Sequence, residues 1–157
     1  GAGLDLDGRL WVSEHGAKGG DEVNRITKGT NYGWPVISYG EHYSGAKIGQ
    51  GTAAEGYEQP LHYWDPSIAP GGMAVYRGDQ FPEWDGDILV TALKFQLLVR
   101  LDVDPETGNV TGEERLLENR YGRMRDVKVA SDGSVLIVTD EDDGRLLRLT
   151  RNSENTD

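Results

Sequence analysis

The chain alternates short apolar runs with polar, glycine-containing turns, and three of its segments share one pattern. Each begins with Asp-Gly, continues through a short run of β-branched and other apolar residues, and ends on a hydroxyl-bearing residue. These segments are residues 7–13, 85–91 and 132–139. Asp-Gly favours a tight turn and a short run of this kind favours a strand, so the pattern predicts a turn that feeds a strand in three places.

Further strands are predicted on both sides of these segments. An arginine stands directly before an apolar residue in residues 23–26, 98–101 and 147–149. Short apolar runs also precede the second and third Asp-Gly turns, at residues 73–76 and 127–129. One unit is therefore a meander of three or four antiparallel strands. The second and third turns begin at residues 85 and 132, a spacing close to the ~40–50 residues of β-propeller blades.

Between the first and second units lies a long segment, residues 34–70, that is rich in Gly, Pro, Tyr and Ser and has no sustained periodicity. Its many aromatic residues favour a packed loop over a disordered one, so we expect an ordered excursion across one propeller face. The predicted blade units span about residues 1–33, 71–118 and 123–152. No segment reads as a helix, because residues 113–118 have some helical propensity but lie between glycine-containing turns.

The predicted fold is therefore all-β: about three blades of antiparallel meanders, or half of a six-bladed propeller. A meander of this kind buries its apolar face only by stacking on a neighbour, so three blades leave open ends.

Composition narrows the range of functions. The 157 residues, 36% of them apolar, are enough for one domain with a buried core. A formal charge of −11 repels phosphate backbones and anionic lipids, which argues against a nucleic-acid or membrane-surface partner. No apolar run approaches the ~18 residues needed for membrane insertion. Without cysteine the chain has no disulfide, no thiolate nucleophile and no zinc–thiolate site.

The most unusual segment is residues 14–24, followed at once by residues 31–35. Carboxylates, amides and a run of glycines stand between a predicted strand ending at Ser13 and another beginning near Val23. Backbone carbonyls in such a loop can turn toward a hard cation, which suggests a cofactor and calcium loop. An acidic, glycine-rich surface loop is the alternative.

Seven short motifs together carry a family resemblance, because they occur in order and at compatible spacing. They are His15-Gly16, Asp21-Glu22-Val23-Asn24, Asn31-Tyr32-Gly33-Trp34-Pro35, Tyr63-Trp64-Asp65-Pro66-Ser67-Ile68-Ala69-Pro70, Gly72-Met73-Ala74-Val75-Tyr76, Ala92-Leu93-Lys94 and Arg123-Met124-Arg125-Asp126-Val127. Along essentially its whole length the chain resembles the C-terminal half of the soluble sugar dehydrogenases that depend on pyrroloquinoline quinone (PQQ), the glucose/sorbosone dehydrogenase family of six-bladed propellers. The resemblance implies calcium- and PQQ-dependent oxidation of aldose sugars to lactones, an external electron acceptor, and a periplasmic or secreted location.

The resemblance assigns cofactor contacts to three cations. Lys94 matches the family lysine that contacts PQQ, and Arg123 with Arg125 match its arginine pair. An i, i+2 spacing in an extended segment directs both guanidiniums to one side, where planar forks can clamp carboxylates of the anionic quinone. The alternative for each residue alone is a solvated surface cation.

The resemblance also assigns metal ligands. The calcium that contacts the quinone is held in the family partly by backbone carbonyls that match Gly16 and Ala17, and many relatives carry proline where this chain has Ala17. That departure bears on the rigidity of the loop rather than on its ligand chemistry. A second, structural calcium would use the carboxylate of Glu22 and a backbone oxygen near Tyr32, whereas Asp21 could instead cap a turn.

No catalytic residue is assigned in this chain. The general base of the family is a histidine in its N-terminal half, and His15, His42 and His62 do not match it. The isolated chain is therefore expected to be inactive. Trp64 would form a wall of the sugar pocket or, equally, a buried anchor for the loop.

Two explanations account for the open ends. The chain is part of a longer product whose N-terminal half completes the ring, or two copies pair head to tail to close it. A non-catalytic sugar- or ligand-binding half propeller is the alternative function. A calcium-dependent lactonase fits less well, because the Lys94, Arg123 and Arg125 set does not supply the acidic and amide ligands that it would need.

Overall fold

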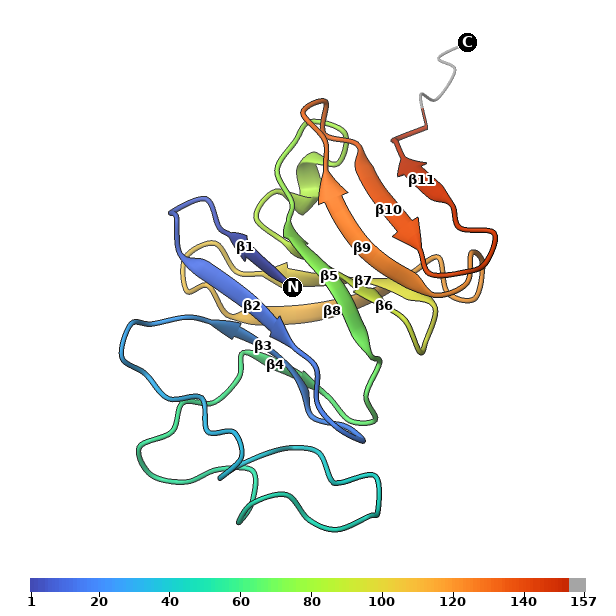
Figure 1. Cartoon of the computed structure of the whole chain (residues 1–157). Coiled ribbons are helices and arrows are strands. Elements are labelled where there is room, and N and C mark those ends of the chain that lie inside the picture. Colours follow the sequence, from blue (N-terminus) through green and yellow to red (C-terminus); the bar gives the residue numbers. More distant parts are fainter. Residues whose placement is uncertain (153–157) are drawn as a thin grey trace.

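The structure, a computed structural model, describes residues 1–152 and is built from three antiparallel sheets (Figure 1). The first sheet has the order β1-β2-β3-β4, with β1 Ala2–Leu4, β2 Leu10–Glu14, β3 Asp21–Arg25 and β4 His62–Trp64. The second has the order β5-β6-β7-β8, with β5 Pro70–Val75, β6 Ile88–Ala92, β7 Leu97–Val103 and β8 Val110–Leu116. The third has the order β11-β10-β9, with β9 Met124–Val129, β10 Val135–Thr139 and β11 Leu146–Leu149. A single 3₁₀ turn, η1 Pro82–Trp84, is the helical element of this region.

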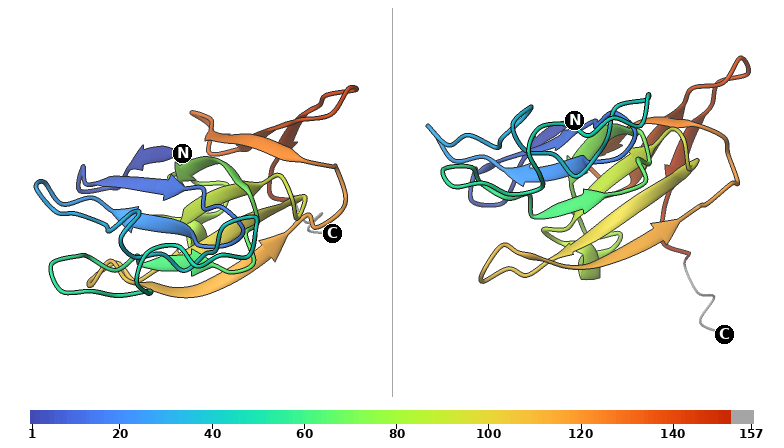
Figure 2. Two further views of the ribbon diagram at one scale, coloured as in Figure 1. Left: turned by 60° about the horizontal axis from the view of Figure 1, so that its bottom comes forward. Right: turned by 90° about the horizontal axis from the view of Figure 1, so that it is seen from below.

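Each sheet is a meander in which consecutive strands pair, and the first strands of the three sheets are neighbours. β5 packs against both β1 and β9 (Figure 1), and the second sheet lies between the other two (Figure 2). This is the arrangement of successive propeller blades, whose inner strands surround a common axis. The predicted all-β fold of about three blades is confirmed. No helix within residues 1–152 is long and apolar enough to cross a membrane.

The long excursion differs from its predicted form at one point. Residues 62–64 form β4, which pairs with β3 and completes the first sheet, so the first blade extends well beyond residue 33. The rest of the excursion carries only the isolated bridge between Glu41 and Lys47 among its described residues. It is nevertheless packed, because Ile37 and Ile48 are buried and the ring of Tyr39 stacks on that of Tyr63 at a centroid distance of 3.8 Å.

The core has two layers, one on each face of the second sheet. Ile88 and Val90 pack with Trp11 of the first sheet, whereas Leu89 packs with Met124 of the third. Because β6 is covered on both faces, every residue of it is buried and its sequence does not alternate between apolar and polar residues: Thr91 is its single polar member.

The two outer sheets each leave one face without a neighbouring sheet in this chain. Leu4 pairs with Leu10 in register, and both point away from the core that the next residue, Trp11, enters. In the third sheet Val138 pairs with Leu146, and both are exposed on the corresponding free face. These two surfaces, the free faces of the first and third sheets, are the open ends expected of an incomplete ring.

Glu113 joins the outer strands of the first two sheets. Its carboxylate on β8 lies 2.9 Å from Nε2 of His62 and accepts a 2.9 Å hydrogen bond from Nε1 of Trp64, both on β4, while Arg115 Nε donates at 2.7 Å. The bond to His62, with further contributions from Arg115 and Trp64, lowers the pKa of Glu113 to about 2. The carboxylate therefore favours the folded state in its charged form.

We expect Glu113→Gln to lower the free energy of unfolding at pH 7 by about 2–3 kcal/mol and the melting temperature by roughly 5–10 °C. The folded pKa lies below the ordinary value of 4.5, so this stabilisation is complete above pH 4.5 and is lost as the pH falls toward 2. Urea denaturation of the parent and of Glu113→Gln at several pH values between 7 and 3 measures the difference between their free energies of unfolding, which should become smaller as the pH falls. Glu114→Gln is the control. Glu114 lies on β8 next to Glu113 and pairs with Arg100 of β7 at the surface, so this variant should change stability by less than about 0.5 kcal/mol.

Candidate functional site

The loops that carry the predicted cofactor residues lie at one end of the sheets. β5 begins at Pro70, which pairs with the last residue of β6, Ala92. β9 begins beside them, because a side chain at Gly71 would collide with the backbone carbonyl of Arg125. Lys94 lies two residues after the end of β6, and its backbone N–H donates to Ile68 O at 3.0 Å. The Lys94 turn and the arginine pair therefore belong to the same end of the second and third sheets.

The two arginines are brought together by one carboxylate. Arg123 Nε and Nη2 donate to Asp140 Oδ2 at 3.3 and 3.2 Å, and Arg125 Nη2 donates to the same oxygen at 2.7 Å. The bonds from Arg125, followed by those from Arg123, lower the pKa of Asp140. Both guanidiniums thus lie on one side of the extended segment, as the i, i+2 spacing predicts, and both remain about half exposed.

Lys94 is exposed, and its Nζ lies 5.5 Å from the centre of the Phe95 ring. Within residues 1–152 no carboxylate lies within ion-pair distance of it. Its ammonium is therefore free to meet an anionic ligand.

Asp21 fixes the glycine loop that contains Gly16. Its carboxylate is fully buried and accepts hydrogen bonds from Gly16 N at 2.8 Å, Ser67 Oγ at 3.0 Å, Ile68 N at 2.8 Å and Ala69 N at 3.1 Å. The turn-capping role considered for Asp21 is the one observed. The buried carboxylate of Asp21 therefore links the predicted calcium loop to the segment that precedes β5. The backbone N–H of Lys94 donates to Ile68 O in that same segment.

The glycines of this loop are required by close backbone approach. A side chain on Gly16 would collide with the carbonyl of Gly19, and one on Gly20 would meet the backbone of Gly40. Gly20 also has a φ of 73°, in the region that favours glycine. The loop therefore folds tightly on itself and against the excursion, which holds the carbonyls of Gly16 and Ala17 in a defined place.

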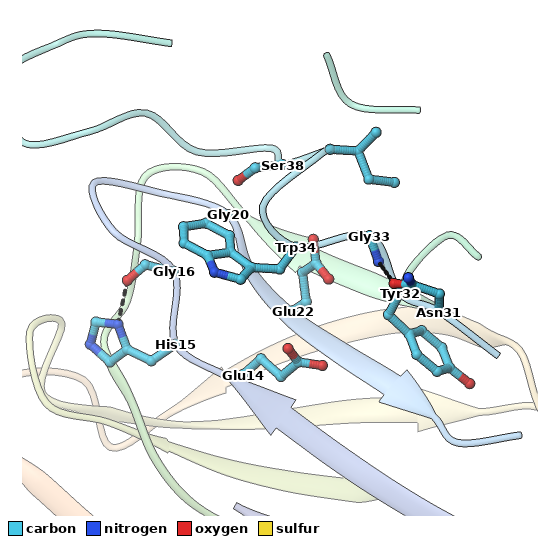
Figure 3. Close-up of a pocket in the computed structure, with 11 residues that line it drawn as sticks. Glu14, His15, Gly16, Gly20, Glu22, Asn31, Tyr32, Gly33, Trp34 and Ser38 are labelled. Atoms are coloured by element: carbon cyan, nitrogen blue, oxygen red, sulfur yellow. Dashed lines mark hydrogen bonds between the residues drawn. The ribbon is translucent and has the colours of Figure 1, made fainter. Parts of the chain in front are cut away.

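An acidic pocket opens beside this loop, on the free face of the first sheet. The cavity measures about 370 Å³. Glu14 on β2 and Glu22 on β3 are direct partners in register, and their side chains approach it from neighbouring strands (Figure 3). Burial, followed by the negative charge of Glu14, raises the pKa of Glu22. The pocket thus holds two neighbouring carboxylates, one of which, Glu22, is disfavoured in its charged form.

Asn24 is buried next to the two carboxylates of this pocket, and Tyr32 is one of the residues that line it. Asn24 Nδ2 donates to Glu14 at 3.0 Å and to Glu22 at 3.3 Å, while its buried Oδ1 has no hydrogen-bond partner within the described part of the chain. The hydroxyl of Tyr32 points away from Glu14 and Glu22 (Figure 3) and bonds to Arg25 O at 2.8 Å, so only its backbone can face a bound cation. No three His, Cys, Asp or Glu side chains in residues 1–152 form a ready-made metal cluster.

The remaining predicted residues have structural surroundings. Trp64 is 4% exposed in the core between the first two sheets, which leaves no free ring face for a sugar and matches the buried anchor considered above. His62 bonds to Glu113, and His42 is exposed in the excursion. His15 Nδ1 lies 2.6 Å from Gly16 O and belongs to the glycine loop, as expected.

Sequence reasoning missed Asp140, Glu14 and the full role of Asp21. Asp140 stands in the acidic run 140–143, which reads as a solvated turn. Glu14 was part of the unusual segment 14–24, but it was assigned no role as a ligand. The signal for Asp21 was its place beside Glu22 in a strand that begins with two acids: side chains alternate along a strand, so one of the two carboxylates must face the core and needs partners there.

Comparison with known proteins identifies the family. The Glucose / Sorbosone dehydrogenase family model matches residues 1–148. The aldose sugar dehydrogenase YliI of Escherichia coli K12 is 43% identical over 143 residues, which are 90% of this chain and 38% of that protein. The chain therefore spans about two fifths of the length of this relative.

Solved structures agree with the sequence comparison. The soluble aldose sugar dehydrogenase of Escherichia coli in its apo-form is 41% identical, with a TM-score of 0.87 over 94% of this chain and 43% of that one. The PQQ-bound aldose sugar dehydrogenase of Streptomyces coelicolor is 27% identical, with a TM-score of 0.71 over 95% of this chain and 42% of that one. By its sequence and its fold, the chain belongs to the glucose/sorbosone dehydrogenase family.

Proposed function

We propose that this chain provides the cofactor-clamping part of a PQQ- and calcium-dependent dehydrogenase that oxidises aldose sugars to lactones. The observation that carries the proposal is the convergence of Arg123 and Arg125 on one carboxylate oxygen, at the end of the sheets where Lys94 also lies. Three cations gathered in a chain of net charge −11 call for an anionic ligand. Similarity to a PQQ-bound aldose sugar dehydrogenase supports the quinone as that ligand.

Each residue has a chemical role toward the cofactor. When bound, PQQ accepts a hydride from the sugar and passes the electrons to an external acceptor. Arg123 and Arg125 would donate paired hydrogen bonds to its carboxylates, because planar forks match carboxylate geometry. Lys94 would act as a point charge on a carboxylate or a quinone oxygen.

The glycine loop would hold the calcium at the quinone. Backbone carbonyls of Gly16 and Ala17 are hard oxygen ligands of the kind that calcium prefers. The loop fits this role because Asp21 anchors Gly16 and the glycine packing fixes its path, so that proline at position 17 is not needed for rigidity.

A second calcium fits the acidic pocket. The pocket offers the carboxylates of Glu14 and Glu22 and the backbone at Tyr32 as oxygen ligands for a divalent cation. Next to both carboxylates lies the buried Asn24 Oδ1, which has no hydrogen-bond partner within residues 1–152. Glu22 would be its principal ligand, with Glu14 as a further carboxylate beside those expected from the family.

We expect Glu22→Gln to abolish the stabilisation that calcium in the acidic pocket provides, measured without PQQ so that the site at Gly16 and Ala17 lacks its quinone ligand. The raised pKa of Glu22 means that its charged form disfavours the folded state, so without metal the variant should be as stable as the parent or slightly more stable. With calcium at about 100 times its dissociation constant, the parent should gain about 2.7 kcal/mol and the variant little. Thermal melts with and without calcium measure this, with Glu55→Gln in the exposed loop as the control. If calcium stabilised Glu22→Gln as much as it stabilised Glu55→Gln, Glu22 would not be a calcium ligand.

The general base must come from outside this chain's residues 1–152. Of its three histidines, His15 belongs to the glycine loop, His42 lies in the excursion and His62 contacts Glu113. We propose that the N-terminal half of the propeller, or a second copy of the chain, completes the sugar site. A periplasmic or secreted location suits a calcium-dependent site and is part of the same proposal. Binding of PQQ without sugar oxidation is the behaviour expected of the chain alone.

Titration with PQQ and calcium, followed by the cofactor's absorbance, tests the proposed function. The Lys94→Ala variant should bind PQQ roughly 5–30-fold more weakly, because it loses one charge-assisted contact. Lys28→Ala removes an exposed lysine from the turn after β3 and should leave affinity unchanged. Equal affinity in the Lys94 and Lys28 variants would contradict the assignment of Lys94.

The alternative function is a sugar- or ligand-binding half propeller whose second copy closes the ring. Apolar side chains on both free faces favour such a partner, and the two faces differ in charge. Glu14 and Glu22 lie on the first sheet's face, whereas Lys128 and Arg148 lie with Asp126 on that of the third. Sedimentation decides this point, because a stable single-chain species would exclude the paired ring. Sugar binding that is independent of PQQ and of Lys94 would favour the alternative over the dehydrogenase.

A further inference from the structure

Asp140 is held in place by the backbone as well as by its side chain. Its N–H donates to Arg123 O at 2.7 Å, and Arg123 N–H donates in turn to Glu141 Oε1 at 2.7 Å. The residue follows β10 directly, where Thr139 pairs with Met124 next to a register shift after Val138. The turn after β10 and the start of β9 are therefore tied together on both sides of the arginine pair.

The carboxylate uses one oxygen for both arginines. Oδ2 receives three N–H donors, from Arg123 Nε and Nη2 and from Arg125 Nη2. Arg123 is thus held by one edge and keeps Nη1 free, while Arg125 keeps Nε and Nη1 free within the part of the chain that the structure covers. A guanidinium has five N–H donors in a fixed plane, so fixing one edge also sets the direction of the others.

A carboxylate beside two arginines that bind an anion could compete with the anion or could orient the arginines. A competing carboxylate would occupy the N–H groups that the ligand needs and would have to leave before the ligand binds. Asp140 instead neutralises one of two adjacent positive charges, whose repulsion would otherwise drive the guanidiniums apart, and it leaves N–H groups of both arginines open.

We propose that Asp140 is a positioning residue that holds Arg123 and Arg125 in the orientation in which they grip a carboxylate of PQQ. The inference rests on the proposed function for its ligand. It goes beyond that function by assigning a role to an acidic residue in a site that binds an anion. Charge alone makes the opposite prediction, because removing a negative group near an anionic ligand should strengthen binding.

The test compares Asp140→Asn with Asp132→Asn. Asparagine keeps the shape of the side chain and removes its charge. Asp132 is a matched control because it is also exposed, also pairs with an arginine, Arg148, and lies in the turn at the opposite end of the third sheet. PQQ titration with calcium should show roughly tenfold weaker binding for Asp140→Asn and no more than a twofold change for Asp132→Asn. Affinity equal to or above that of the parent in Asp140→Asn would overturn the proposal.

A second measurement does not depend on the cofactor. In the ligand-free protein, the Nε–H NMR signal of Arg123 should be distinct and slow to exchange with water, and it should lose both properties in Asp140→Asn but not in Asp132→Asn. A parent signal that already exchanges freely would refute the positioning role even if PQQ binds. If PQQ fails to bind the parent, the proposed function fails, whereas this signal still decides the role of Asp140.

Discussion

Replacing Asp21 by alanine is expected to lower the free energy of unfolding by about 3–5 kcal/mol and the melting temperature by roughly 10 °C or more. The carboxylate is fully buried and accepts hydrogen bonds from the backbone of Gly16, Ile68 and Ala69 and from the hydroxyl of Ser67. Without it, these donors remain buried with no acceptor, and an unmade buried hydrogen bond costs more than a made one contributes. Urea denaturation at pH 7 measures the change.

The control for this experiment is Asp65→Ala, which removes an exposed carboxylate next to the same turn. It should change stability by less than about 0.5 kcal/mol. A loss below about 1 kcal/mol in Asp21→Ala would mean that water or a rearranged turn satisfies the donors. The milder Asp21→Asn should still fold, and it should weaken any calcium effect on the Gly16 loop, because the amide accepts fewer bonds than the carboxylate.

The blades were predictable because their signals are local. Each Asp-Gly turn and the apolar run after it specify a strand within a few residues, and β2, β6 and β10 appear where residues 10–13, 88–91 and 135–139 predict them. β4 was missed because it is only three residues long and forms through pairing with β3, whose sequence lies far away. No local pattern in a glycine- and proline-rich loop reports such a partner.

The site was predictable only in part, and for a different reason. Lys94, Arg123 and Arg125 were found by resemblance to a family. A resemblance of this kind indicates which residues contact the cofactor, but not which other side chains of the protein hydrogen-bond to them. The shared acceptor Asp140 lies in a run of acids that is indistinguishable from a solvated turn until β10 is aligned with β9. Trp64 illustrates the converse, because an aromatic residue in a motif serves a pocket or a core equally well, and only its burial between two sheets separates the two.

The double variant Arg123→Ala with Arg125→Ala is expected to weaken PQQ binding by roughly 100- to 1,000-fold. A charge-assisted hydrogen bond contributes about 1.5–3 kcal/mol, which corresponds to roughly 10- to 100-fold in affinity for each arginine. Both guanidiniums bind the same oxygen of Asp140 at 2.7–3.3 Å, so each helps to hold the other. We therefore expect the two single variants to be non-additive, with a coupling measured by the full double-mutant cycle.

Stability and binding must be separated for this result to be informative. Both side chains are about half exposed and make no core contact, so melting temperatures should stay within a few degrees of the parent. Arg120→Ala, which removes an exposed arginine from the turn before β9, controls for net charge and should bind PQQ like the parent. Lysine at both positions keeps the charge but loses the planar forks, so it should recover only part of the affinity. Full affinity in the double alanine variant would show that the quinone binds elsewhere, and the three cations would then have to be explained as a solvated rim of the propeller.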